Sequence, residues 1–283
     1  MPSATLLGQS LLSGVFVGGL YGLLGLGLSL SWGLLRLINL AHFALAFLGA
    51  YLTYQLSTTF GLNPFLTLVV VVPAFFLIGV VLHALFTRFG VTEFTSLLVT
   101  FGVTVVIESV IQIFWTADFR KLETPLTGVS LRIGPLYFPL VEVLVLATGA
   151  ALCGVTWAWL RYTYVGKALR ASAEDPVMAA AFGVDHTRLA LILSGVSGAC
   201  AGVAGAFLAL MSALAPSQIY GPIGVVFAAV IIGGLGNPLG PLWAGIVIGV
   251  SEALTMALTA PAWAPLVSFS VLIVLLIARP GRV

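Results

Sequence analysis

The chain has 283 residues, of which 60% are hydrophobic and only 7% are charged, and its formal net charge is +2. Soluble domains carry about 25% charged residues, so this chain lacks the polar side chains that a water-facing surface needs. The composition therefore excludes a soluble protein and predicts an integral membrane protein.

The apolar residues form long continuous runs, such as "LTLVVVVPAFFLIGVVLHALF". A membrane β-barrel needs short segments that alternate apolar and polar residues, whereas about twenty consecutive apolar residues cross a bilayer as a helix. The runs therefore predict an all-α polytopic membrane protein. The candidate spans are residues 5–30, 38–57, 64–87, 94–116, 136–160, 189–213, 219–236, 238–258 and 262–278. Segment 219–236 is short and rich in glycine and either crosses the membrane or is broken, so we expect a bundle of eight or nine transmembrane helices.

Charged residues gather in the loop 161–188, between the fifth and sixth spans. This loop holds Arg161, Lys167, Arg170 and Arg188. Because basic residues are enriched in cytoplasmic loops, we expect this loop and the C-terminus, with Arg279 and Arg282, to be cytoplasmic and the N-terminus to lie outside. Arg36 and Arg88 then fall on the inner side, whereas the basic residues of loop 117–135 fall outside and argue against this orientation.

Glycines recur at a spacing of four residues in several spans. The pairs are Gly14/Gly18, Gly18/Gly22, Gly198/Gly202 and Gly245/Gly249. In lipid, small residues at this spacing let two helix backbones approach closely. We therefore interpret these glycines as helix-packing residues, in preference to a direct role at a substrate.

Within the charged loop, "EDPVMAAAFG" has the pattern of a short helix. Asp175 suits the N-cap, Pro176 the first helical position and Gly183 the position after the C-cap. The upstream stretch "GKALRASA" is expected to form another short helix. The helix at 176–182 would present the apolar residues Val177, Met178, Ala181 and Phe182. Such a face suits either a groove in another protein or the lipid headgroup layer, and the pattern alone leaves both open.

Four stretches, in order along nearly the whole chain, resemble one family. They are "WGLLRLINLAHFALAFLGAYLTY", "GKALRASAEDPVMAAAFGVDHTR", "GGLGNPLGPLWAGIVIGVSEAL" and "IARPGRV". The chain resembles the branched-chain amino-acid type ABC importer permeases, in particular their LivH-like membrane subunits. The resemblance implies one permease domain over residues 1–283, in a bacterial inner membrane. It also implies a second permease subunit (a paralogue), two cytoplasmic ATP-binding-cassette ATPases and an external substrate-binding protein as partners, with no nucleic acid.

The resemblance assigns the charged loop a role in coupling. ATPase closure would reach the membrane helices through a set of residues in this loop. The set is Gly166, Arg170, Glu174, Asp175, Pro176, Met178, Ala179, Phe182 and Gly183. A phosphate-binding loop needs the pattern GxxxxGK[ST], and neither Lys121 nor Lys167 stands in it. We therefore expect this chain to bind no cofactor, and ATP and Mg²⁺ to be used by the partner ATPases.

Polar residues inside the spans are candidates for the substrate path, because they are costly at membrane depth. The candidates are Asn39, His42 and Tyr51 in the second span, Asn237 between the seventh and eighth, and Glu252 in the eighth. For Glu252, and for Glu108 in the fourth span, we favour a hydrogen bond to a neighbouring helix over a contact with a substrate ammonium. No catalytic set and no metal-ligand spacing is found.

Other functions stay open at this point. The same importer architecture could carry urea, short amides, aromatic acids or a sugar. A self-sufficient secondary transporter or channel would need a coupling-ion site, for which Glu108 and Glu252 are the candidates. A membrane-embedded scaffold is a third class.

Overall fold

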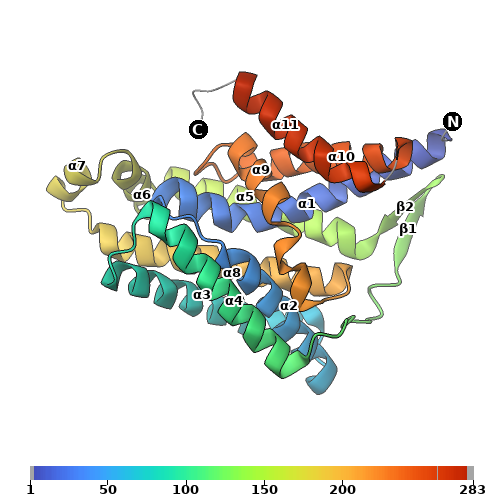
Figure 1. Ribbon diagram of the computed structural model, residues 1–283, viewed down its shortest axis with the longest axis horizontal. Coiled ribbons are helices and arrows are strands. Elements are labelled where there is room, and N and C mark those ends of the chain that lie inside the picture. The colour runs from blue at the N-terminus through green and yellow to red at the C-terminus, as the bar shows by residue number, and fades with distance from the viewer. Residues whose placement is uncertain (1–2, 260, 279–283) are drawn as a thin grey trace.

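The computed structural model describes residues 3–259 and 261–278, and these form a bundle of helices with one small hairpin (Figure 1). The helices are α1 (Ala4–Leu35), α2 (Ala41–Phe60), α3 (Pro64–Arg88), α4 (Glu93–Trp115), α5 (Leu140–Tyr162), α6 (Tyr164–Glu174), α7 (Pro176–Ala181), α8 (His186–Met211), α9 (Ile223–Gly233), α10 (Gly240–Leu258) and α11 (Ala264–Ala278). Two short 3-10 helices, η1 (Pro216–Tyr220) and η2 (Pro261–Trp263), precede α9 and α11. The predicted all-α fold class is confirmed.

Seven helices of the described part are long and apolar enough to cross a membrane, so the chain is a multi-pass membrane protein. They are α1, α3, α4, α5, α8, α10 and the segment Pro216–Gly233. The expected count of eight or nine is not confirmed, since α2 and α11 are not among the helices that are both long enough and apolar enough to cross a membrane. Segment Pro216–Gly233 is broken, because Gly221 and Pro222 separate η1 from the 11 residues of α9.

Two of the predicted span boundaries differ from the structure at α1 and α5. Helix α1 continues to Leu35, beyond residue 30, and ends where Arg36 adopts a left-handed conformation with a φ of 55°. The start of the predicted span 136–160 is wrong, because residues 136–139 belong to an antiparallel hairpin of β1 (Ser130–Ile133) and β2 (Leu136–Pro139). Its turn contains Gly134 at a φ of +62°.

The predicted glycine packing is confirmed between α1 and α10. A Cβ on Gly14 would lie 2.6 Å from the Val250 Cα, and one on Gly245 would lie 2.6 Å from the Gly18 carbonyl oxygen. No side chain fits at these positions, so the two backbones touch along several turns. Gly198 of α8 makes the same kind of close approach to the Phe75 carbonyl oxygen of α3, and Gly202 packs against the Phe75 side chain.

The charged loop and the hairpin lie at opposite ends of α1. At the start of α1, the Gln9 side chain donates to the Tyr137 carbonyl oxygen over 2.9 Å and accepts from the Tyr137 N–H. At its end, the Arg36 guanidinium donates to the Ala173 carbonyl oxygen of α6 over 3.4 Å. Arg36 therefore shares a side with the charged loop, as expected. Arg279 and Arg282, on which the prediction for the C-terminus depends, lie outside the described residues.

Candidate functional site

The chain between α1 and α2 is not helical, and after the exposed Arg36 its residues 37–40 are half-buried. The N–H groups of Ile38 and Leu40 donate to the side-chain hydroxyls of Ser96 and Thr100 on α4, over 3.1 and 3.0 Å. Non-helical backbone at membrane depth is tolerated only where its polar groups are bonded or face a cavity. The two hydroxyls of α4 therefore make this break stable.

Two predicted path residues lie at this break. His42 is fully buried, and its Nε2 lies 3.0 Å from the Leu24 carbonyl oxygen. Since a carbonyl only accepts, Nε2 carries the hydrogen and Nδ1 is left as an acceptor. His42 Nδ1 and Asn39 Oδ1 are both buried and have no hydrogen-bond partner in the described residues. The break therefore holds two unbonded acceptors, which suit an ammonium group or a water molecule.

Tyr51 is also fully buried but belongs to another part of α2. Nine residues separate it from His42, or about 13 Å of helix. Its ring centroid lies 5.4 Å from that of Trp115, and its hydroxyl has no partner in the described residues. Beyond Trp115, the Arg120 side chain donates to the Trp115 carbonyl oxygen, and the Arg120 backbone pairs with that of Leu214 over 2.9 and 2.7 Å.

A second break joins α9 to α10 at the sequence "GLGNPL". Gly234 and Gly236 have φ angles of 89° and 77°, which favour glycine. The Gly236 N–H donates to the Ser29 carbonyl oxygen of α1 over 3.2 Å. The Asn237 carboxamide oxygen accepts from the Leu239 N–H over 3.2 Å, so this side chain shapes the turn. Asn237 is exposed and lines a cavity of about 500 Å³.

Glu108 and Glu252 are both hydrogen-bonded to other elements, as favoured from the sequence. Glu252 is 7% exposed and accepts from the Tyr21 hydroxyl of α1 over 3.0 Å and from the Ser268 hydroxyl of α11. Glu108 accepts from the Tyr220 hydroxyl of η1 over 2.6 Å. Glu252 of α10 is therefore hydrogen-bonded to both α1 and α11.

Replacing Glu252 with glutamine separates a structural role from a substrate contact. An amide can still accept from Tyr21 and bond Ser268, so we expect Glu252→Gln to keep both thermal stability and transport. Glu252→Ala leaves the half-buried Tyr21 hydroxyl and the buried Ser268 hydroxyl without their acceptor, at about 1–3 kcal/mol for the buried one, and we expect it to lower the melting temperature of the purified protein. If the Glu252→Gln variant is stable but no longer transports, the negative charge of Glu252 acts in the substrate path.

The charged loop folds as the pattern predicts. Upstream, "GKALRASA" lies within α6, and Asp175 caps α7 by accepting from the N–H groups of Val177 and Met178, each over 3.0 Å. Gly183 follows the helix at a φ of +80°. Val177, Met178 and Phe182 are 77%, 55% and 82% exposed. Beside them, α6 and α7 enclose a groove of about 470 Å³ that includes Lys167, Met178 and Phe182.

The five predicted path residues do not form one site. Asn39 and His42 share the first break, Tyr51 lies toward the hairpin end, Asn237 shapes the second break, and Glu252 joins three helices. The prediction missed the residues that hold the breaks, namely Ser29, Ser96 and Thr100, and also Arg120. Ser96, Thr100 and Thr104 recur every four residues and are all buried, so helical spacing alone could have indicated this polar stripe on α4.

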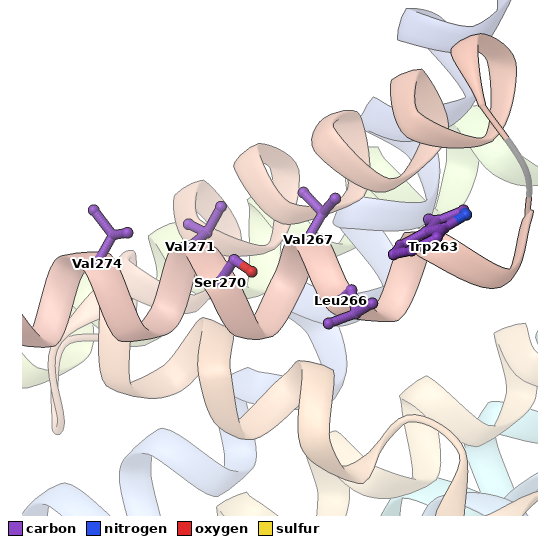
Figure 2. A pocket seen from close by; sticks show the side chains of 6 residues that line it. All are labelled: Trp263, Leu266, Val267, Ser270, Val271 and Val274. Atoms are coloured by element: carbon purple, nitrogen blue, oxygen red, sulfur yellow. The ribbon is translucent and has the colours of Figure 1, made fainter.

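A shallow apolar hollow of about 510 Å³ lies along α11 and η2. Figure 2 shows Val267, Val271 and Val274 on one side of α11, with Trp263 near its start. Ser270 is the one polar side chain of this lining. This largely apolar composition suits contact with lipid chains.

Comparison with known proteins places these features in a family. The sequence profile described as "Branched-chain amino acid transport system / permease component" matches residues 10–276. The permease protein LivH of the high-affinity branched-chain amino acid transport system of Salmonella typhimurium is 25% identical over 96% of this chain and 93% of its own length.

Two further relatives come from other organisms. A probable branched-chain amino acid transport permease protein LivH of Methanocaldococcus jannaschii is 32% identical over 82% of this chain and 76% of its own length. The permease protein BraD of Pseudomonas aeruginosa, also from a high-affinity branched-chain amino acid transport system, is 22% identical over 96% of this chain and 94% of its own length. No solved structure matches the chain. The chain belongs to the family of branched-chain amino acid transport system permease components.

Proposed function

We propose that this chain is a membrane-spanning permease subunit of an ATP-binding-cassette importer that translocates branched-chain or related amino acids. The family and the names of the relatives support the transport of such amino acids. In this proposal a second permease subunit, two ATPases and an external binding protein complete the importer. The chain itself binds no nucleotide, and ATP and Mg²⁺ act on the ATPases.

The observation that carries the proposal is the geometry of α6 and α7. A helix of six residues is marginal alone, yet α7 is capped by Asp175 at its start and followed by Gly183. Exposed apolar side chains flanked by charges are typical of a helix that lies in another protein's groove. Helix α6 packs on α5, and Arg36 at the end of α1 donates a hydrogen bond to α6. A displacement of α7 would therefore be transmitted through α6 to the membrane helices α1 and α5. The charged loop then lies in the cytoplasm.

Alternating access requires backbone that can rearrange, and the two breaks supply non-helical backbone between membrane helices. Broken helices at a binding site are a recurrent device of transporters. The unbonded acceptors of Asn39 and His42 suit the ammonium group of an amino acid. The described spans carry few charges along this route, which favours a small zwitterion over a polyanion.

Purification of the tagged chain from its native membrane in mild detergent tests this proposal. Mass spectrometry is expected to identify ATPases with a phosphate-binding loop and a second permease in the same size-exclusion peak. Vesicles reconstituted with this complex and the binding protein are expected to take up radiolabelled leucine only when ATP is enclosed with the ATPases. A chain that purifies alone and still transports after reconstitution would contradict the proposal and direct attention to Glu108 and Glu252.

A further inference from the structure

A cavity of about 500 Å³ lies where α5, α6 and the α9–α10 turn meet. Its lining combines the arginines Arg161 and Arg170 with Trp157, Leu160 and the turn residues Gly236, Asn237 and Pro238. No acidic residue belongs to it. The proposed function assigns no ligand to this cavity, although Arg170 also belongs to the set of residues that the resemblance implies for coupling.

Both guanidinium groups are free to bind an anion. In the described residues, neither arginine has a carboxylate within 4.0 Å or a side-chain hydrogen bond, and the one ion pair there joins Arg188 to Asp185. Arg161 is positioned by aromatic contacts, with its Cζ 5.1 Å from the ring centroid of Trp157 and 5.9 Å from that of Tyr162. The planar fork of donors on arginine matches the oxygens of a phosphate group.

The position of the cavity in the fold indicates which kind of phosphate group it would bind. Helix α5 ends its apolar span at Tyr162, and α6 is the first helix of the charged loop. Tryptophan and tyrosine are enriched where a span meets the headgroup layer. Basic pockets between helices at this level suit anionic headgroups. The apolar surfaces of Trp157, Leu160 and Pro238 beside two arginines match a group that is charged at one end and bonded to acyl chains at the other.

We propose that this cavity binds the phosphate headgroup of an anionic membrane lipid. Arg161 of α5 and Arg170 of α6 hold the phosphate, and Trp157 contacts the glycerol and the upper acyl chain. Since the lining spans α5, α6 and the turn at Asn237, a bound headgroup links the charged loop to the second break. This inference depends on the membrane-embedded fold and holds whichever solute the protein carries.

Lipid binding to the delipidated full-length protein tests the proposal. Native mass spectrometry is used with two probes, dioleoyl phosphatidylglycerol and dioleoyl phosphatidylcholine. We expect the wild-type protein to retain phosphatidylglycerol in preference. The double variant Arg161→Gln/Arg170→Gln is expected to bind it about tenfold or more weakly, because each arginine near a lipid surface adds about a factor of five in affinity.

A matched double variant, Lys167→Gln/Arg188→Gln, removes the same charge from the same loop outside the cavity. We expect it to keep wild-type affinity. Equal loss in both double variants, or no preference of the wild-type protein for phosphatidylglycerol, would overturn the proposal. So would arginine-dependent binding of inorganic phosphate alone that phosphatidylglycerol does not displace. The conservative variant Arg161→Lys/Arg170→Lys, expected to keep part of the affinity, keeps the test decisive if the glutamine variant fails to fold.

Discussion

Under the proposed importer function, replacing Gly183 with valine is expected to lower ATP-driven uptake about tenfold or more while the protein still assembles in the membrane. Gly183 has a φ of +80°, and a β-branched residue in this conformation costs about 1–2 kcal/mol. Because α7 has only six residues, it has little stability to lose. The exposed apolar face would lose its shape, whereas substrate affinity of the external binding protein would not change. Uptake of a radiolabelled amino acid into membrane vesicles measures this effect.

Gly134 offers the matched control for this variant. It has a φ of +62° in the hairpin turn at the other end of α1, and a Cβ there would meet no atom within 4 Å. Gly134→Val therefore introduces the same kind of strain away from α7 and is expected to leave uptake near the wild-type rate. Asp175→Leu, which removes the cap of α7, should behave like Gly183→Val. Normal uptake in both α7 variants would contradict the proposed coupling role.

A second large effect is expected where α1 meets α10. A Cβ on Gly18 would lie 2.5 Å from the Gly245 carbonyl oxygen, which belongs to backbone that cannot rotate away. Gly18→Val would force the two helices apart, and overpacking of this kind costs about 1–3 kcal/mol. We expect the melting temperature of the purified protein to fall by roughly 2–10 °C and its amount in the membrane to fall with it.

Gly154→Val is the control for Gly18→Val. Gly154 lies within α5, and a Cβ there would meet no atom within 4 Å. Both variants place valine inside a long membrane helix, so the helix propensity of valine affects both in the same way. The variants differ in the space available around the new side chain. An equal loss of stability in the two variants would show that α1 and α10 do not pack through Gly18.

Features that depend on neighbouring residues could be predicted from the sequence. Asp175, Pro176 and Gly183 act within one short helix, and the structure confirms the cap and the left-handed glycine. The glycines at Gly14, Gly18, Gly245 and Gly249 predicted close helix packing, because in lipid little else brings helices so near. That these glycines bring α1 against α10 could not be predicted, because any two helices with a glycine-rich face can pack in this way.

Features that join distant segments could not be predicted. The bonds from Ile38 and Leu40 to Ser96 and Thr100 cross about 60 residues of chain, as the separations of 58 and 60 positions show. The pairing of Arg120 with Leu214 is of the same kind. Candidate path residues were chosen because they are polar in apolar runs, and this property does not place them together. Asn237 and Glu252 accordingly bond different partners in different parts of the bundle.

The claim that α7 contacts a partner ATPase is tested most directly by photo-crosslinking from Phe182, whose side chain is 82% exposed. A photoreactive phenylalanine analogue at this position would be irradiated in native membranes, with the same analogue at Val155 of the membrane helix α5, which is 65% exposed, as the control. The account predicts that position 182 crosslinks to a peripheral protein with a phosphate-binding loop and that position 155 does not. Crosslinking of position 182 to lipid alone, in membranes that transport, would contradict it.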